Sequence, residues 1–270
     1  MAGPTTAEHG AHKPPNTGDG SARSPLGGAP RGRLRVPGPR SLLIALAVAL
    51  LGAATIWVLY GSPWLRAERV RTTGTDELSE REVEAVAAVP LGTPLISVDT
   101  DAIEARLRDK LPRVDSVEAT RSWPHGIDLK VTERQPVLLL KKGSNYVEVD
   151  AKSVRFATVD PLKAPKRVPV LELAADGSPS LKRFGSDRLV AEAVRVRADV
   201  PASVAADTRV IAVRSYDAIS LELSGDRTVV WGSSEDGAAK ARSLVALMKA
   251  APKARHFDVS APTAPSVSDS

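Results

Sequence analysis

The stretch Val117–Thr132, with the sequence VEATRSWPHGIDLKVT, decides the fold of the region around it. Apolar and polar residues alternate after its centre, where Ile127, Leu129 and Val131 are separated by Asp128 and Lys130 and followed by Thr132. A weaker alternation, through Val117, Ala119 and Arg121, precedes the centre. A period of two is typical of a strand with one buried face. Because Trp123-Pro124-His125-Gly126 contains turn residues, the stretch predicts a β-hairpin.

The residues before this hairpin predict two helices and a short strand. Ser79-Glu80-Arg81-Glu82 is a capping-box pattern, and Val83, Val86 and Ala87 follow on one helical face. Asp99 is a candidate N-cap for a second helix, in which Ile103, Leu107 and Leu111 recur every four residues before Pro112. Arg69 to Thr73 reads as a strand ending at Gly74. The order strand, helix, helix, strand, strand predicts a small α+β module.

Further toward the N-terminus lies an apolar run, Ser41–Tyr60, with the sequence SLLIALAVALLGAATIWVLY and no charged residue. Twenty helical residues reach about 30 Å, which is the thickness of a bilayer core, so the run predicts a transmembrane helix. A buried globular helix and a cleaved signal peptide are the alternatives. Globular helices keep a polar face, and residues 59–63 lack the A-x-A cleavage pattern.

Residues 1–40 contain eight Gly, seven Pro, six basic and two acidic residues, and we expect them to be disordered. They carry +4 of the net charge of +5, so the rest of the chain is nearly neutral and we expect no nucleic-acid partner. Arg31, Arg33, Arg35 and Arg40 precede the apolar run. The positive-inside rule therefore predicts a single-pass type II protein, with a cytoplasmic N-terminus and an extracytoplasmic C-terminus.

Several blocks in fixed order after the apolar run resemble the FtsQ/DivIB family of bacterial cell-division proteins. These blocks are Val70-Arg71-Thr72-Thr73-Gly74, Val89-Pro90-Leu91-Gly92-Thr93-Pro94-Leu95, Asp99, Val114-Asp115-Ser116-Val117, Arg121-Ser122-Trp123-Pro124 and Val131-Thr132-Glu133-Arg134-Gln135-Pro136-Val137. The resemblance implies a polypeptide-transport-associated (POTRA) domain over residues 65–136. It also implies a second domain over residues 137–260, mainly of antiparallel β-structure with flanking helices. We expect residues 261–270 to be a disordered tail, and the Ala-, Arg- and Val-rich composition suggests an actinobacterial source.

The sequence offers no recognisable catalytic chemistry. Cysteine is absent, which excludes thiolate metal sites and a cysteine nucleophile. No phosphate-binding loop, zinc-protease, hydrolase or penicillin-binding motif is present. Helix capping accounts for Asp99 and Asp101, and the expected turn accounts for His125. We therefore expect neither an enzyme nor a cofactor nor a bound metal.

The resemblance implies a non-catalytic scaffold of the divisome, located in the cell membrane at the division septum. It would link small bitopic coiled-coil proteins of the FtsB/DivIC and FtsL type and influence septal peptidoglycan synthases through that complex. Two alternatives remain open. One is a membrane-anchored cell-wall enzyme or wall-binding module, and the other is a transport-type POTRA chaperone.

The expected partner site is the last predicted strand, His256-Phe257-Asp258-Val259-Ser260. A terminal strand that follows a helix is expected at a sheet edge, where unpaired backbone groups can receive an added strand. Phe257 and Val259 share one face of this strand and would receive an apolar anchor. The alternative is that both side chains pack on the last helix. The family resemblance also implies that the end of the second domain receives an FtsB-type partner.

Overall fold

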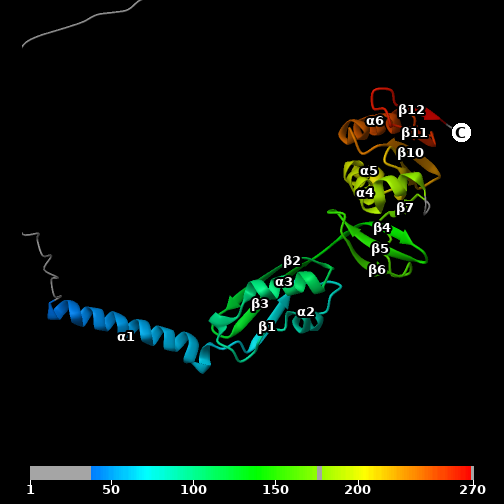
Figure 1. Ribbon diagram of the computed structural model, residues 1–270. Coiled ribbons are helices and arrows are strands. Elements are labelled where there is room, and N and C mark those ends of the chain that lie inside the picture. Colours follow the sequence, from blue (N-terminus) through cyan, green and yellow to red (C-terminus); the bar gives the residue numbers. More distant parts are fainter. Residues whose placement is uncertain (1–37, 175–177, 269–270) are drawn as a thin grey trace, which may run out of the picture. The chain divides into compact units, whose positions relative to one another are not determined.

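The computed structural model describes residues 38–174 and 178–268, and these form an α+β fold (Figure 1). This confirms the predicted fold class. The expected disordered tail lies outside the described residues over positions 1–37, as do the last two residues of the chain. Within the described residues, one apolar helix is followed by a three-stranded sheet and then by a nine-stranded sheet.

The apolar run forms helix α1 (Pro39–Gly61), which buries none of its residues against the rest of the protein. By length and composition it is suited to cross a membrane. It begins two residues before and ends one residue after the predicted span. A short 3-10 helix, η1 (Pro63–Leu65), follows at once, and the Ser62 hydroxyl accepts a hydrogen bond from the Trp64 N–H at its start.

The first domain has the predicted order of elements. Its strands β1 (Arg69–Thr73), β2 (Val114–Ser122) and β3 (Gly126–Glu133) lie in the order β1-β3-β2. β2 and β3 form the expected antiparallel hairpin, and β1 runs parallel to β3. Helices α2 (Glu80–Ala87) and α3 (Thr100–Lys110) supply the apolar faces that pack with this sheet (Figure 1).

Both helices of the first domain begin at the predicted caps. The Ser79 hydroxyl accepts a hydrogen bond from the Glu82 N–H, and the Asp99 carboxylate accepts one from the Ala102 N–H at 3.0 Å. Ile127, Leu129 and Val131 point into the core, as their alternation predicts. The 3-10 helix η2 (Leu95–Ser97) precedes α3.

Glu133, the last residue of β3, is a buried acid that organises the segment before α2. Its carboxylate accepts hydrogen bonds from the backbone N–H groups of Asp76, Glu77 and Leu78, at donor–acceptor distances of 2.8–3.2 Å. The charge is therefore compensated by three donors that would otherwise lack a partner in a loop. This contact joins two segments that are more than fifty residues apart in the sequence.

The second domain is built on a nine-stranded mixed sheet in the order β12-β11-β10-β9-β8-β7-β4-β5-β6. Its strands are β4 (Pro136–Lys142), β5 (Asn145–Asp150), β6 (Arg155–Val159), β7 (Val170–Leu173), β8 (Thr208–Ser215), β9 (Ala218–Leu223), β10 (Arg227–Gly232), β11 (His256–Asp258) and β12 (Ser266–Ser268). Five of its eight strand pairs are antiparallel, which agrees with the expected mainly antiparallel domain.

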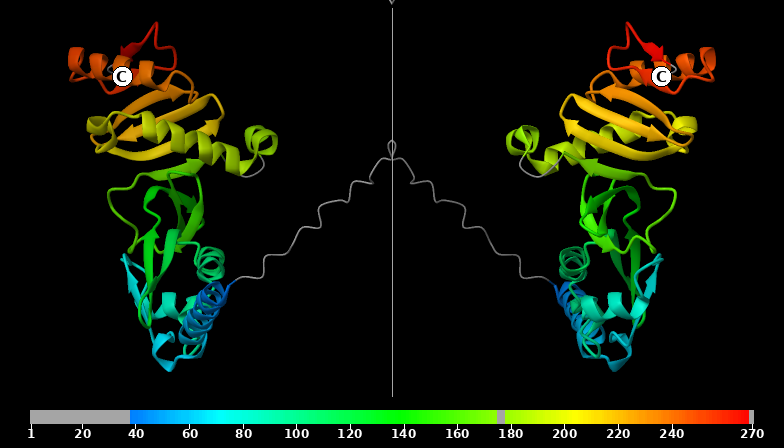
Figure 2. Two further views of the ribbon diagram at one scale, coloured as in Figure 1. Left: turned by 90° about the vertical axis from the view of Figure 1, so that its left-hand side faces the viewer. Right: turned by 90° about the vertical axis from the view of Figure 1, so that its right-hand side faces the viewer.

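Three helices accompany this sheet: α4 (Pro179–Asp199), α5 (Ala202–Ala205) and α6 (Gly237–Ala250). Figure 2 shows α4 crossing the strands on one face of the sheet. Gly185 interrupts α4 with φ of +75°, a conformation that favours glycine, so the helix is kinked there. Beyond the kink, Leu189, Ala193 and Val196 join the core of the domain.

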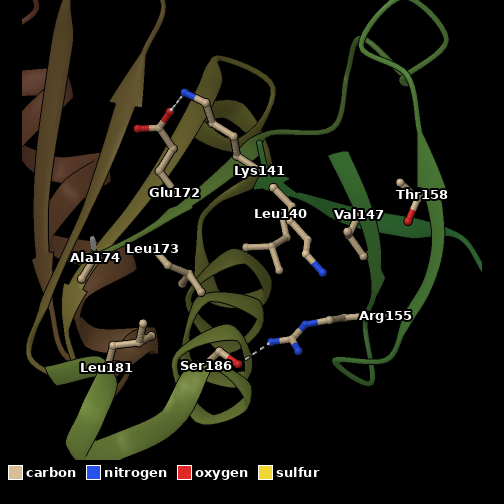
Figure 3. Close-up of a pocket in the computed structure, with 11 residues that line it drawn as sticks. Leu140, Lys141, Val147, Arg155, Thr158, Glu172, Leu173, Ala174, Leu181 and Ser186 are labelled. Atoms are coloured by element: carbon tan, nitrogen blue, oxygen red, sulfur yellow. Dashed lines mark hydrogen bonds and ion pairs between the residues drawn. The ribbon is translucent and has the colours of Figure 1, made fainter. Parts of the chain in front are cut away.

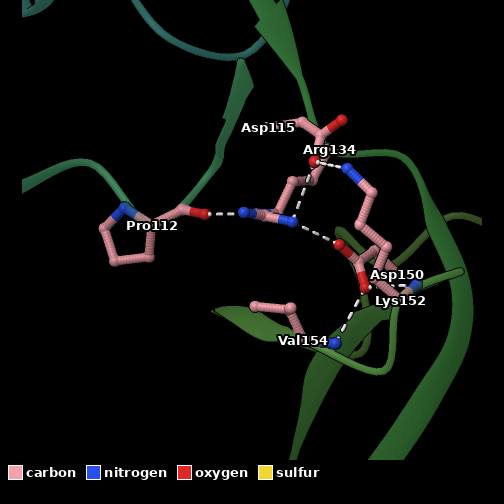
Figure 4. Close-up of polar contacts among 6 residues, drawn as sticks. All are labelled: Pro112, Asp115, Arg134, Asp150, Lys152 and Val154. Carbon is pink, nitrogen blue, oxygen red and sulfur yellow. Dashed lines mark hydrogen bonds and ion pairs between the residues drawn. The ribbon is translucent and has the colours of Figure 1, made fainter. Parts of the chain in front are cut away.

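Arg134 ties the first domain to the second (Figure 4). Its guanidinium donates to the Pro112 carbonyl at 3.0 Å, to Asp115 of β2 at 3.0 Å and to Asp150 of β5 at 2.5 Å. Lys152 adds a second cation beside Asp115, and this hydrogen bond lowers the pKa of Asp115. Because the pKa is lowered in the folded state, this contribution to stability is present at neutral pH and is lost as acid protonates Asp115.

A second ion pair lies at the same junction. Arg113 donates to the buried carboxylate of Glu148 at 2.8 Å, and its guanidinium lies over the Phe156 ring, 5.3 Å from the centroid. An arginine that is both paired and stacked on an aromatic ring loses little when it leaves water. The junction is therefore held by specific charged contacts rather than by a flexible linker.

The core position of Leu129 gives a direct test of the first domain. Leu129→Asp would place a charge among buried apolar side chains and should lower the free energy of unfolding by several kcal/mol. Thr132→Asp is the matched control, because Thr132 lies on the same strand with its side chain exposed. Urea unfolding of residues 62–270, monitored by circular dichroism, measures the free energy of unfolding of both variants. Equal stability of the two variants would contradict the placement of Leu129 in the core.

Candidate functional site

The predicted partner strand does not lie at the sheet edge, so this part of the prediction is wrong. β11 pairs in parallel with β10 on one side and antiparallel with β12 on the other. The edge strand at this end of the sheet is β12, in a segment that we expected to be disordered (Figure 1), and β6 is the edge strand at the other end. Ser266-Val267-Ser268 contains one apolar residue and too little local pattern to indicate a strand. Pairing with β11 orders it.

The two apolar residues of the predicted site belong to the core. Phe257 is 2% exposed and Val259 is fully buried, and both lie in the cluster that includes Leu244 of α6. The Val259 N–H also donates to the Val230 carbonyl at 3.0 Å. Neither side chain is available to an incoming anchor, so the alternative, packing against the last helix, is the arrangement found.

The polar residues of the predicted site remain nearer the surface. His256 and Ser260 are exposed, and Asp258 is half-buried. One oxygen of Asp258 accepts hydrogen bonds from the backbone N–H of Ser260 at 2.9 Å and from its hydroxyl at 2.7 Å. Asp258 therefore stabilises the turn that leads the chain out of β11 and back toward β12.

The segment between β11 and β12 is fixed against its surroundings. The Ser243 hydroxyl of α6 donates to the Pro262 carbonyl at 3.1 Å, and the Ala264 N–H donates to the Ala261 carbonyl at 3.0 Å. Gly232 of β10 lies close to Ser260 at the start of this segment. A Cβ atom at position 232 would lie 2.9 Å from the Ser260 Cβ. These contacts place β12 opposite β11, with His256 opposite Ser268 and Asp258 opposite Ser266.

β12 offers an open backbone edge and an apolar side chain. Within the part of the chain that the structure describes, no strand pairs with its outer side. Val267 is 40% exposed. A cavity of about 260 Å³ lies beside it, lined by Val230 of β10, residues 256–258 of β11 and residues 266–268 of β12. An edge of this kind can accept an extended peptide as an additional strand.

A buried polar network supports the loop between β10 and α6. The Lys240 side chain is 2% exposed, and its ammonium group donates to the Ser233 carbonyl at 2.8 Å. Burial lowers the pKa of Lys240, while Asp236 and Glu235 act in the opposite direction. The buried Glu192 of α4 accepts hydrogen bonds from the Ser234 hydroxyl and from Arg195. No motif in the sequence identified this network, because Lys240 and Glu192 read as ordinary surface charges on their helices.

A separate cavity of about 720 Å³ lies between α4 and the strands β4 to β7 (Figure 3). It is lined in part by the ion pair of Lys141 with Glu172 at 2.8 Å and by Arg155, which donates to Ser186. The hydrogen bond that Lys141 donates to Glu172 raises the pKa of Lys141. Lys141 and Arg155 are thus each engaged with a partner on a neighbouring element.

His125 and the acidic residues of the described chain form no further candidate site. His125 lies in the β2–β3 turn, and its Nδ1 lies 3.1 Å from the Trp64 carbonyl oxygen. Across the described ranges, no three His, Asp or Glu side chains come close enough together to hold a metal ion.

The burial of Phe257 predicts a loss of stability on truncation. Phe257→Ala should lower the free energy of unfolding by about 3–5 kcal/mol, because it leaves a cavity between β11 and α6. Val267→Ala at the half-exposed neighbouring position should change it by less than about 1 kcal/mol. Urea unfolding of residues 62–270 compares the two variants. A neutral Phe257→Ala would contradict the core position of the ring.

Comparison with known proteins places this arrangement in a family. Residues 65–134 match the model of the FtsQ-type POTRA domain. The chain is 60% identical to the cell division protein FtsQ of Streptomyces venezuelae, over all of this chain and 99% of that protein. It is 59% identical to the FtsQ of Streptomyces coelicolor over the full length of both, and 32% identical to that of Mycolicibacterium smegmatis over 91% of this chain and 69% of that protein. The relatives are actinobacterial, as the composition suggests. The chain therefore belongs to the FtsQ family of bacterial cell-division proteins.

Proposed function

We propose that this division protein is a non-catalytic scaffold that binds other membrane-anchored division proteins through the β12 edge. The observation that carries the proposal is the open outer side of β12 at the end of a nine-stranded sheet. Backbone N–H and C=O groups along such an edge bind an extended segment with little dependence on its sequence, and side chains add specificity. Val267 and the adjacent cavity supply an apolar contact.

The expected partners are small bitopic coiled-coil proteins of the FtsB/DivIC and FtsL type. A short segment after their coiled coil would pair with β12, and the polar residues His256, Asp258 and Ser260 would lie beside the contact. Through this complex the chain would influence septal peptidoglycan synthesis. The alternative of a cell-wall enzyme or wall-binding module finds less support, because Lys141, Glu172 and Arg155 at the larger cavity are each paired with another side chain.

The proposed location follows from α1 and the charges before it. The helix spans the cell membrane, the arginines between positions 31 and 40 hold the N-terminus in the cytoplasm, and both folded domains lie outside. The site of action is the division septum, where the partners are assembled.

Photo-cross-linking in the native membrane tests the partner edge. A photoreactive phenylalanine analogue in place of Val267 should cross-link to small single-span proteins that contain a coiled coil, because an added strand would lie within reach of this side chain. Val245 on α6 is the matched control, since it has the same side chain and a similar exposure of 46% against 40%. The cross-linked products are identified by mass spectrometry.

Two outcomes would count against the proposal. Cross-links of equal strength from Val245 would show a contact that is not specific to β12. Recovery of glycan strands from Val267 in place of protein would favour a wall-binding module.

A reporter enzyme that is active only outside the cytoplasm tests the topology. Fused after Ser270, it should be active, and fused before Arg40, it should be inactive. Changing Arg31, Arg33, Arg35 and Arg40 together to Glu should weaken or invert this pattern, because basic residues set the orientation. The reverse pattern in the unmodified chain would contradict a cytoplasmic N-terminus.

A further inference from the structure

Three large apolar side chains are exposed at one end of the first domain: Trp64, Leu91 and Trp123. Their exposed fractions are 70%, 58% and 49%. Elsewhere in the described residues after α1, the exposed large apolar residues are valines and one leucine and include no tryptophan: Val154, Leu162, Val230, Val245 and Val267. We call the three residues the aromatic end. Exposed tryptophan side chains gathered in one place usually mark a contact surface.

Hydrogen bonds fix the three segments that carry the aromatic end. The His125 ring joins the β2–β3 turn to the Trp64 carbonyl at 3.1 Å, and the Glu68 N–H donates to the His125 carbonyl at 2.9 Å. The loop that carries Leu91 is bound to the same strand entrance, because the Gly92 N–H donates to the Ala67 carbonyl at 2.7 Å. The aromatic end is thus a built surface rather than three independent loop tips.

The chain itself holds this surface close to α1. Helix α1 ends at Gly61, and Trp64 follows three residues later. Three residues span at most about 10 Å, and η1 makes the connection shorter still. One residue, Pro124, separates Trp123 from His125, whose ring contacts the Trp64 carbonyl. Whatever surrounds the C-terminal end of α1 therefore also lies beside the aromatic end.

Basic side chains flank the same surface. Arg69 and Arg71 are exposed on β1, and Arg69 lies opposite Gly126 next to the β2–β3 turn. In the part of the chain that the structure describes, neither arginine forms an ion pair with an acidic side chain. Two acidic residues are near: Glu68 precedes Arg69 in the chain, and Asp128 of β3 lies opposite Arg71. Unpaired arginines beside exposed aromatic rings match the headgroup layer of an anionic bilayer.

We propose that the aromatic end of the first domain sits in the headgroup layer of the membrane that α1 crosses. Trp64, Leu91 and Trp123 enter the interface, and Arg69 and Arg71 face the phosphates of anionic phospholipids. The domain would then be held by the membrane at two places, the helix and its own surface. This inference rests on the span proposed above, and Trp57 near the end of α1 reports on that span separately.

Fluorescence quenching of the full-length chain in phosphatidylglycerol vesicles tests the contact. The fully buried Trp231 stays in every variant as a constant background. Trp64→Phe with Trp123→Phe leaves Trp57 as the reporter, and Trp57→Phe with Trp64→Phe leaves Trp123. The control combines Leu162→Trp with Phe at the other three positions, because Leu162 is 93% exposed in a loop of the second domain.

The expected result is a loss of Trp123 emission when the lipids carry a nitroxide on the headgroup. Trp57 should also be quenched, whereas the Leu162→Trp control should keep its emission. If Trp57 is quenched while Trp123 keeps its emission as the control does, the proposal is overturned but the membrane span of α1 is supported. Unquenched Trp57 would instead contradict the span, and with it the proposal.

The charge assignment is tested in the Trp123 reporter. Arg69→Gln with Arg71→Gln should reduce the quenching in phosphatidylglycerol vesicles, and Lys110→Gln at the end of α3 should not. Unchanged quenching in the double variant would overturn the role of anionic headgroups. Acrylamide in the aqueous phase distinguishes a lipid contact from a protein contact. If Trp123 is protected from acrylamide in native membranes but not in vesicles that contain this chain and no other protein, a partner protein covers the aromatic end and the proposal fails.

Discussion

Two adjacent charged residues at the end of β3 hold this protein together. The Glu133 side chain points into the first domain and accepts hydrogen bonds from three backbone N–H groups of the segment before α2. Arg134 turns the other way and joins Pro112, Asp115 and Asp150 across the domain junction. Glu133 is the last residue of β3 and Arg134 is the first residue after it, so two adjacent positions in the sequence serve both purposes. Glu133 is buried and Arg134 is half-buried, and removing a partner of either would leave a charge with less compensation.

The sequence predicts the first domain well because its signals are local. The alternation through Ile127, Leu129 and Val131 is a property of one strand, and the caps Ser79 and Asp99 act within one helical turn. Each element carries its own pattern, and the tertiary structure only assembles them. The role of Arg134 could not be predicted in this way, since its partners lie on elements up to 22 residues away in the sequence and bring no pattern of their own.

The strand predicted as the partner site is not the strand at the edge of the sheet. The alternation of Phe257 and Val259 identifies a strand with one apolar face, and a pattern of this kind is equally consistent with a core and with a docking surface. The deciding residues are Ser266-Val267-Ser268, whose order comes from pairing with β11 and from the Ser243 contact with Pro262. A three-residue strand of this composition has no local signal, and its short length also limits the open edge available for unwanted pairing.

One boundary between neighbouring strands of the second domain is joined by few paired residues. β4 and β7 are joined through two residue pairs, Leu139 with Val170 and Leu140 with Leu171, the fewest between neighbouring strands of this sheet in the described residues. On one side of this boundary, β5 is tied by two ion pairs to the first domain. On the other side lie all the strands that lead to β12. A pull applied at β12 is carried from strand to strand to this boundary, where the two residue pairs and the ion pair of Lys141 with Glu172 resist it. Tension that separated the sheet at this boundary would leave the outer strands and their edge folded while they moved away from the anchored domain.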